Sequence, residues 1–184
     1  VQNGVPTEKC FISHFGVDTS VFQPRSTIPT DPVFVCVALL SLRKGQQYLF
    51  RAMEIVRETL PNARLVCVGS LRPDFEDEYK RWKGTFEYHI RMTPAEIATL
   101  LKSSTAFVLP SVEEGFARVL SEAMASGFPV VATYETGATT VVRDGIEGLI
   151  VPSRNVESLA EAMIRLASDK DMNTRMGSQA LATG

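Results

Sequence analysis

Residues 33–69 decide the fold class, and they read VFVCVALLSLRKGQQYLFRAMEIVRETLPNARLVCVG. The run Val33–Leu40 is continuously apolar, which is typical of a strand covered on both faces. Over Gly45–Leu60, apolar side chains recur at the i, i+3, i+4 spacing of one helix face. Residues 63–69 then form a second apolar run that ends in glycine. A strand, a helix and a second strand with short connections predict a parallel βαβ unit.

The alternation of strands and helices continues through the rest of the chain. Thr93, Pro94 and Glu96 match a capping box with proline at the first helical position, so a further helix begins at Pro94. The other expected elements are a polar helix over 74–83, a weak strand near 86–90, strands over 106–109, 129–133 and 148–151, a helix over 116–126, and one or two helices from Val156. This order predicts an α/β fold, a Rossmann-like parallel sheet with helices on both faces.

Composition and charge narrow the class of protein. The chain has 184 residues, of which 45% are hydrophobic and 22% charged, and this suits one well-buried soluble domain. A net charge of −2 gives no electrostatic footprint for nucleic acid. No apolar run approaches the roughly 20 residues that span a bilayer. The sequence therefore predicts a soluble protein that does not bind nucleic acid.

The cysteines and histidines indicate neither disulfides nor a metal site. Cys10, Cys36 and Cys67 lie in apolar runs. An odd number of cysteines in strand-like segments indicates buried, reduced thiols, as in a cytoplasmic protein. Only His14 and His89 are available to join them, and no metal-ligand spacing is present, so we expect no metal.

The first part of the chain differs from the rest. Val1–Arg25 holds one expected short strand, Cys10–Ser13, and a turn-rich tail. We predict that Val1–Arg25 is an interdomain linker or edge segment and that residues 26–184 are the globular domain. Because the chain begins with Val1 rather than Met, we also expect it to be a fragment of a longer protein.

The loop after the first strand is a candidate anion site. In an open parallel sheet, ligands bind beyond the carboxyl ends of the strands. Here the loop holds Arg43, Lys44 and Gly45 directly before a helix. The free amides and the dipole of a helix start attract negative charge, and Lys44 adds a full positive charge. The alternative is a solvated basic turn that only shapes the entry to the helix.

The loop after the strand at 106–109 is a second candidate. Gly115 permits close approach of the backbone to a ligand, and the amides of Phe116, Ala117 and Arg118 are expected to be unpaired donors at a helix start. Glu114 fits beside them if the ligand also carries hydroxyl groups, because an ionised carboxylate only accepts hydrogen bonds. The alternative is an ordinary acidic helix N-terminus, stabilised by the dipole.

Glu122 lies eight residues after Glu114. On one helix this separation corresponds to about 12 Å along the axis. A glycosidase needs two carboxyl groups about 5–10 Å apart, converging on one bond. The spacing instead suits the two ends of one long ligand, such as a sugar and a ribose. Glu122 falls on the polar side of its helix, so a solvated surface residue is the alternative.

Four segments together resemble a known family. GVDTSVFQP (16–24), RKG (43–45), PSVEEGFARVLSEAMASGFPVVAT (110–133) and RDGIEGLIVP (143–152) occur in this order. The series resembles the C-terminal lobe of retaining glycosyltransferases of the group 1, or glycogen-synthase-like, family. These enzymes have two facing Rossmann-like lobes, the GT-B architecture. The resemblance covers nearly the whole chain.

The resemblance implies a reaction and roles for residues. A hexose passes from a nucleoside diphosphate to an acceptor with retention at the anomeric carbon, without a metal or another cofactor. It implies that Glu114 is the acid near the donor sugar and that Lys44 neutralises the departing diphosphate, where electrostatic catalysis concentrates. It further implies that Glu122 binds the ribose. The remaining donor-binding residues that it implies are Gly115, Phe116, Ala117, Arg118 and Val119 through their amides, and Arg91 and Met92 near the base.

The resemblance also implies what this chain lacks. The acceptor belongs mainly to an N-terminal lobe that is absent from the sequence, as does any peripheral contact with the membrane. The donor lobe alone is therefore expected to be inactive. Bacterial polysaccharide or glycolipid synthesis is the expected role of the whole protein.

Departures from the family pattern keep other functions open. Leu39 stands where the family has the arginine that shares the diphosphate, and Arg43 is the candidate substitute; Thr140 stands where the family has a glutamate, and 88–90 lacks its Phe-x-Gly. A binding or regulatory protein that has lost turnover is the main alternative. A sugar-nucleotide epimerase or a phosphorylase, and an unrelated flavodoxin-like module, are the others.

Overall fold

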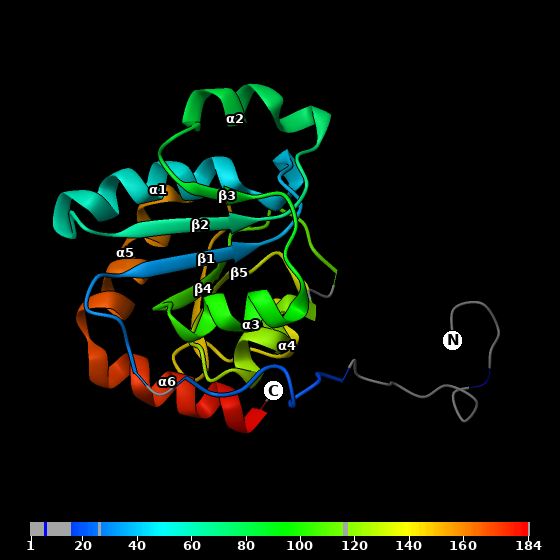
Figure 1. Cartoon of the computed structure of the whole chain (residues 1–184), viewed down its shortest axis with the longest axis vertical. Helices are drawn as coiled ribbons and strands as arrows, with labels where there is room; N and C mark the ends of the chain where they lie inside the picture. Colours follow the sequence, from blue (N-terminus) through cyan, green and yellow to red (C-terminus); the bar gives the residue numbers. More distant parts are fainter. Residues whose placement is uncertain (1–5, 7–15, 26, 116–117, 184) are drawn as a thin grey trace.

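A computed structural model gives the fold of the chain and describes residues 6, 16–25, 27–115 and 118–183. Its centre is a six-stranded sheet in the order β3-β2-β1-β4-β5-β6, and every adjacent pair is parallel (Figure 1). The strands are β1 Val33–Val37, β2 Arg64–Val68, β3 Glu87–His89, β4 Ala106–Leu109, β5 Val130–Thr133 and β6 Gly148–Val151. The predicted Rossmann-like parallel sheet is confirmed.

Helices cover both faces of this sheet, as the sequence predicts. The helices are α1 Gln46–Thr59, α2 Glu76–Trp82, α3 Pro94–Lys102, α4 Arg118–Ala125, α5 Val156–Ser168 and α6 Lys170–Thr183, with short 3-10 turns η2 Leu42–Lys44, η3 Pro73–Phe75 and η4 Gly137–Thr140. One core forms between the sheet and α1 and α5, and a second between the sheet and α3 and α4. Two cores explain why the strands are apolar throughout rather than alternating.

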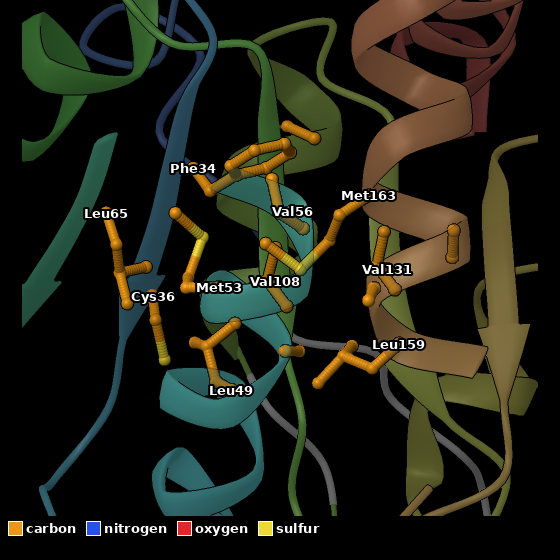
Figure 2. Packing of buried hydrophobic residues seen from close by; sticks show 14 of the residues in the cluster. Phe34, Cys36, Leu49, Met53, Val56, Leu65, Val108, Val131, Leu159 and Met163 are labelled. Carbon is orange, nitrogen blue, oxygen red and sulfur yellow. The ribbon is translucent and has the colours of Figure 1, made fainter. Parts of the chain in front are cut away.

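Strand β1 shows how the two cores share one strand. Phe34 and Cys36 pack with α1 and α5, whereas Val33 and Val35 pack with α3 and α4, because successive side chains point to opposite faces. Figure 2 shows the first of these cores, in which Met53 of α1 and Met163 of α5 meet side chains of the sheet. Cores on both faces hold β1 rigidly in the middle of the sheet, and the loop that follows it carries the candidate site.

Most predicted elements are found within a few residues of their expected bounds. The Thr93 hydroxyl accepts from the Glu96 amide, and the Glu96 carboxylate accepts from the Thr93 amide. The predicted capping box is therefore confirmed. The polar helix expected over 74–83 divides into η3 and α2. An aromatic cluster holds these turns against α1: Phe50 lies 4.3 Å from Phe86 between ring centroids and also meets Phe75 and Trp82.

The end of the N-terminal segment, residues 22–25, packs on the domain beside α6 (Figure 1). Phe22 is buried in the core on the α4 side. Arg25 donates to the carbonyl oxygens of Ser104 and Thr105, each at 3.0 Å, and to the side chain of Asn173. Burial lowers the pKa of Arg25 to about 10, which leaves it charged at neutral pH. The division between linker and domain at residue 25 stays a prediction.

Two predictions for the cysteines have different outcomes. Cys36 and Cys67 are buried, free and directly opposite one another on β1 and β2. Burial is the first cause that raises the pKa of the Cys67 thiol, which makes it a poor nucleophile. The strand expected over Cys10–Ser13 lies outside the described residues.

Candidate functional site

The strand order brings two distant loops together at one edge of the sheet. β1 pairs with β2 on one side and with β4 on the other, so the strand order reverses between β1 and β4. In open α/β sheets the crevice at such a switch point, beyond the carboxyl ends of the strands, is where ligands bind. The loops that leave β1 and β4 are the ones that the sequence predicts to carry chemistry.

Backbone contacts join these two loops. The amides of Val112 and Glu113 both donate to the carbonyl oxygen of Arg43, at 2.9 and 3.4 Å. Gly45 has a φ of +73°, and a β-carbon on it would lie 2.0 Å from the carbonyl oxygen of Pro110. Glycine is therefore needed at position 45 both for its backbone conformation and for the close approach of the second loop.

The two predicted catalytic side chains meet across this contact. Lys44 forms an ion pair with Glu114, and their side chains are only 13% and 11% exposed. Burial is the main cause that lowers the pKa of Lys44, and the neighbouring charge of Arg43 lowers it further. α1 begins at Gln46, two residues after Lys44, and has no side-chain cap, so its first amides add positive potential beside the pair.

Glu114 is held by strand-like contacts and not by a helix. It forms a parallel bridge with Thr136, and its carbonyl oxygen accepts from the Gly137 amide at 3.0 Å. The interpretation that placed Glu114 and Glu122 on one helix is therefore wrong, because Glu114 lies in a bridge and Glu122 in α4. The loop pairs with the segment after β5, and this pairing prevents Glu114 from joining the helix.

A separate apolar cavity lies at the ends of β1, β2 and β3. It has a volume of about 280 Å³, and its walls include Leu39, Ile90, Arg91, Met92 and Val119. The structure thus brings together three predicted donor-binding residues, Arg91 and Met92 from the loop after β3 and Val119 from α4. Leu39 lines this cavity and is 46% exposed, at the position where the resemblance expects an arginine.

Glu122 is half-buried on α4 and not fully solvated. Burial is the first cause that raises its pKa, and the charge of Arg118 opposes the shift. A carboxylate that is partly desolvated in the free protein gains from a hydroxyl donor that reaches it. This environment is compatible with the predicted contact to a ribose, which stays a prediction.

The remaining predicted residues are only partly described. Gly115 is exposed and follows Glu114 directly, whereas Phe116 and Ala117 lie outside the described residues. Within the described ranges, no group of three or more His, Cys, Asp or Glu side chains can hold a metal ion. The helices of those ranges include none that is long and apolar enough to cross a membrane.

Comparison with known proteins identifies the family. The family model described as glycosyl transferases group 1 matches residues 18–183. The chain belongs to this family. The resemblance found in the sequence is thereby confirmed.

Curated relatives of this group 1 domain are similar over most of its length. It is 28% identical to a D-inositol 3-phosphate glycosyltransferase of Kribbella flavida, over 97% of this chain and 47% of that protein. It is 31% identical to a GDP-mannose-dependent monoacylated alpha-(1-6)-phosphatidylinositol monomannoside mannosyltransferase of Corynebacterium glutamicum, over 88% of this chain and 48% of that protein. The chain therefore spans about half the length of these relatives.

Solved structures share the fold of the group 1 domain. The C-terminal domain of a glycosyl transferase group 1 family protein from Francisella tularensis has a TM-score of 0.81 at 22% identity, covering 91% of this chain and 96% of that one. Anabaena HepE in complex with UDP and glucose has a TM-score of 0.82 at 23% identity, covering 98% of this chain and 53% of that one. At these identities the likeness establishes the fold, which is that of the C-terminal lobe of the two-lobed architecture.

Sequence reasoning missed residues that position the site in this group 1 domain. Gln46 is fully buried, donates to the carbonyl oxygen of Leu39 at 2.9 Å and accepts from the amide of Ser41 at 3.4 Å. Thr133 donates to the carbonyl oxygen of Ser111 at 2.5 Å. Both side chains fix the loops through hydrogen bonds to the loop backbone. A lone glutamine or threonine belongs to no sequence motif, so nothing in the sequence distinguishes it from a surface residue.

Proposed function

We propose that this chain is the donor-binding lobe of a hexosyltransferase that uses a nucleoside diphosphate sugar. The observation that carries the proposal is the partly buried Lys44–Glu114 pair at the switch point of the sheet. A cation and a carboxylate in one crevice suit a ligand that presents both phosphate charge and sugar hydroxyls. The apolar cavity around Met92 provides a place for a base at a neighbouring end of the sheet.

In this proposal, binding of the donor rearranges the Lys44–Glu114 pair. Without ligand, the charge of Lys44 is satisfied by Glu114. A diphosphate carries more negative charge than one carboxylate, so it competes for Lys44 and frees Glu114 to accept from hydroxyls of the donor sugar. As the bond to the sugar breaks, charge develops on the leaving diphosphate, and a preorganised lysine stabilises that charge most.

The other predicted residues complete the donor site in the same proposal. Glu122 accepts from the ribose hydroxyls, and the backbone near Arg91 and Met92 contacts the base. Arg43 lies next to Lys44 and neutralises part of the diphosphate charge, because position 39 holds a leucine in place of the expected arginine. The last contributors are backbone amides of residues 115–119.

The finer features of the reaction follow from the family resemblance. We propose transfer with retention, without a metal or other cofactor, in bacterial polysaccharide or glycolipid synthesis in the cytoplasm. The acceptor then binds mainly to a second, N-terminal lobe, which also makes any peripheral contact with the membrane. The isolated lobe is expected to bind the donor without turning it over.

Titration of the 184-residue chain with UDP, GDP and ADP and with their sugars tests the proposal. One base at least should bind, and Lys44→Ala should weaken binding of that diphosphate by about tenfold or more while changing binding of the free nucleoside little. Lys83→Ala, which removes an exposed lysine, is the matched control. Absence of binding across the series would overturn the proposal, and equal losses for diphosphate and nucleoside would remove the role of Lys44.

A second candidate function rests on Leu39. The apolar side chain of Leu39, where the resemblance expects an arginine, removes one expected phosphate contact. The alternative is a sugar-nucleotide-binding or regulatory protein with impaired catalysis. In the full-length protein, Leu39→Arg should then create or raise transfer activity, and a native protein that binds a donor yet neither transfers nor hydrolyses it would favour this alternative.

A further inference from the structure

A second cavity lies on the other side of the Lys44 loop from the proposed base cavity. It has a volume of about 480 Å³, and its walls include Arg43, Gln47, Tyr48, Glu113 and Arg154. Gln47 and Tyr48 belong to the start of α1, Arg154 precedes α5 and Glu113 lies in the loop after β4, whereas the base cavity is lined by residues of α3 and α4. Of the described residues, none lines both cavities.

Two positively charged side chains line the cavity. Arg43 and Arg154 both line it and are exposed. Neither guanidinium forms an ion pair with another described residue. Lys44, which follows Arg43 in the chain, is by contrast paired with Glu114. Guanidinium groups bind phosphate and carboxylate through two parallel hydrogen bonds, so two of them on one cavity favour an anion.

The backbone at Arg154 supports a functional role for this arginine. Its φ of +61° makes it the one non-glycine residue with a positive φ among the described residues. A side chain in this left-handed conformation costs about 1–2 kcal/mol, and such strain concentrates at binding and catalytic sites. A glycine would adopt the same turn without the cost, so the fold alone does not require an arginine here.

The environment of Gln47 indicates that the ligand carries hydroxyl groups. The residue is 9% exposed, and its Nε2 donates to the carbonyl oxygen of Leu42 at 3.1 Å. Its Oε1 is buried without a hydrogen-bond partner. A buried acceptor without a partner is destabilising by about 1–3 kcal/mol, and a small shift of the side chain toward the cavity would let a ligand hydroxyl satisfy it.

Glu113 and Tyr48 complete the chemistry of the walls. The exposed carboxylate of Glu113 accepts from hydroxyls and repels a bare anion, and the ring of Tyr48 offers an apolar face to the carbons of a sugar. We propose that this cavity binds a carbohydrate that carries a phosphate or carboxylate group. Arg154 holds the anion, Arg43 is shared between this cavity and the donor diphosphate, and Gln47 and Glu113 hold the hydroxyls.

This site goes beyond the donor site and stands next to it. The amide of Glu113 is bonded to the carbonyl oxygen of Arg43, and the next residue on each loop belongs to the Lys44–Glu114 pair. A ligand in the cavity therefore contacts Arg43 and Glu113, which directly precede the proposed reacting residues in the chain.

Amide NMR spectra of the 184-residue chain test this site with D-glucose 6-phosphate, D-glucuronate, D-glucose and inorganic phosphate as probes. At least one charged sugar should shift the amides of Gln47, Val112 and Arg154 and bind at least tenfold more tightly than either glucose or phosphate. Equal binding of phosphate alone, or of neutral glucose, would overturn the proposed ligand class. Shifts confined to the cavity around Ile90 and Met92 would overturn the location.

Variants separate this site from the donor site. Arg154→Gln should weaken binding of the charged sugar by about tenfold, and Arg154→Gly should do the same without the strained backbone. Arg51→Gln, on the exposed face of α1, is the matched control and should leave binding unchanged. Undiminished binding in both Arg154 variants would overturn the proposal. Because UDP, GDP and ADP are titrated separately, the charged sugar can bind when every nucleotide fails, and nucleotides can bind when it does not.

Discussion

Gly45 of the first loop lies against Pro110 of the second, so closely that a β-carbon on Gly45 would come within 2.0 Å of the Pro110 carbonyl oxygen. The two residues are distant in the sequence and belong to connections that leave adjacent strands. Their contact fixes the distance between the loops. It thereby determines that Lys44, one residue before Gly45, reaches Glu114, four residues after Pro110.

The first prediction tests this contact through stability. Gly45→Ala should lower the free energy of unfolding by about 2–5 kcal/mol, because it combines a positive φ with a backbone clash. Urea unfolding followed by the fluorescence of Trp82, the single tryptophan, measures the change. Gly84→Ala is the control, since Gly84 also has a positive φ but faces open space, and it should cost about 1 kcal/mol. Similar losses at the two positions would show that the loops do not need this close approach.

The second prediction concerns the energy of the Lys44–Glu114 pair. Lys44→Met leaves a largely buried carboxylate without its partner and should cost about 3 kcal/mol, whereas adding Glu114→Gln should restore part of it. A double-mutant cycle in urea should give a coupling of about 1–3 kcal/mol. The exposed pair Lys80–Asp77 is the control and should show no measurable coupling. Additive effects at Lys44 and Glu114 would contradict the pair.

The third prediction is the pH dependence that Glu122 contributes. Burial raises the pKa of Glu122 above its ordinary value of 4.5, so the folded state binds the proton more tightly than the unfolded state. The cost of the buried charge is therefore absent below pH 4.5 and complete above the raised pKa. Glu122→Gln should stabilise the protein at pH 7 and have little effect at pH 4.

Urea unfolding at the two pH values measures this difference. Glu58→Gln, which changes an exposed residue on α1, is the control and should show the same small effect at both. A loss of stability at pH 7 in Glu122→Gln would contradict the cost of burial. The same variant should weaken binding of a nucleotide if Glu122 contacts the ribose.

The fourth prediction concerns Arg25 and the segment that precedes the domain. One guanidinium donates to Ser104, Thr105 and Asn173 and lies 4.6 Å from the centre of the Phe128 ring. A lysine ammonium lacks the planar fork that reaches these groups together, so Arg25→Lys should cost about 2 kcal/mol despite the conserved charge. Thermal unfolding measures the loss, with Arg51→Lys as the exposed control. Equal melting temperatures would show that charge alone anchors the segment.

Local patterns predicted the elements well because their causes are local. The apolar period of α1 and the capping box at Thr93 arise within one or two helical turns, and both are found where the sequence places them. The placement of Glu114 on the same helix as Glu122 was wrong for the opposite reason. Its backbone is decided by Thr136 and Gly137, which belong to the segment after another strand and leave no trace in the local pattern.

By itself, the sequence determined the strand and helix order, the two covered faces of the sheet, and the loops that hold the candidate residues. Only the tertiary structure decided which of these residues meet: that Lys44 pairs with Glu114, 70 positions away, that Glu122 is half-buried, and that Arg154 shares a cavity with Arg43. The physical reason is that hydrophobic periodicity specifies which side of an element is buried. Which strands become neighbours depends on the packing of the whole sheet, and the placing of β1 beside β4 creates the site.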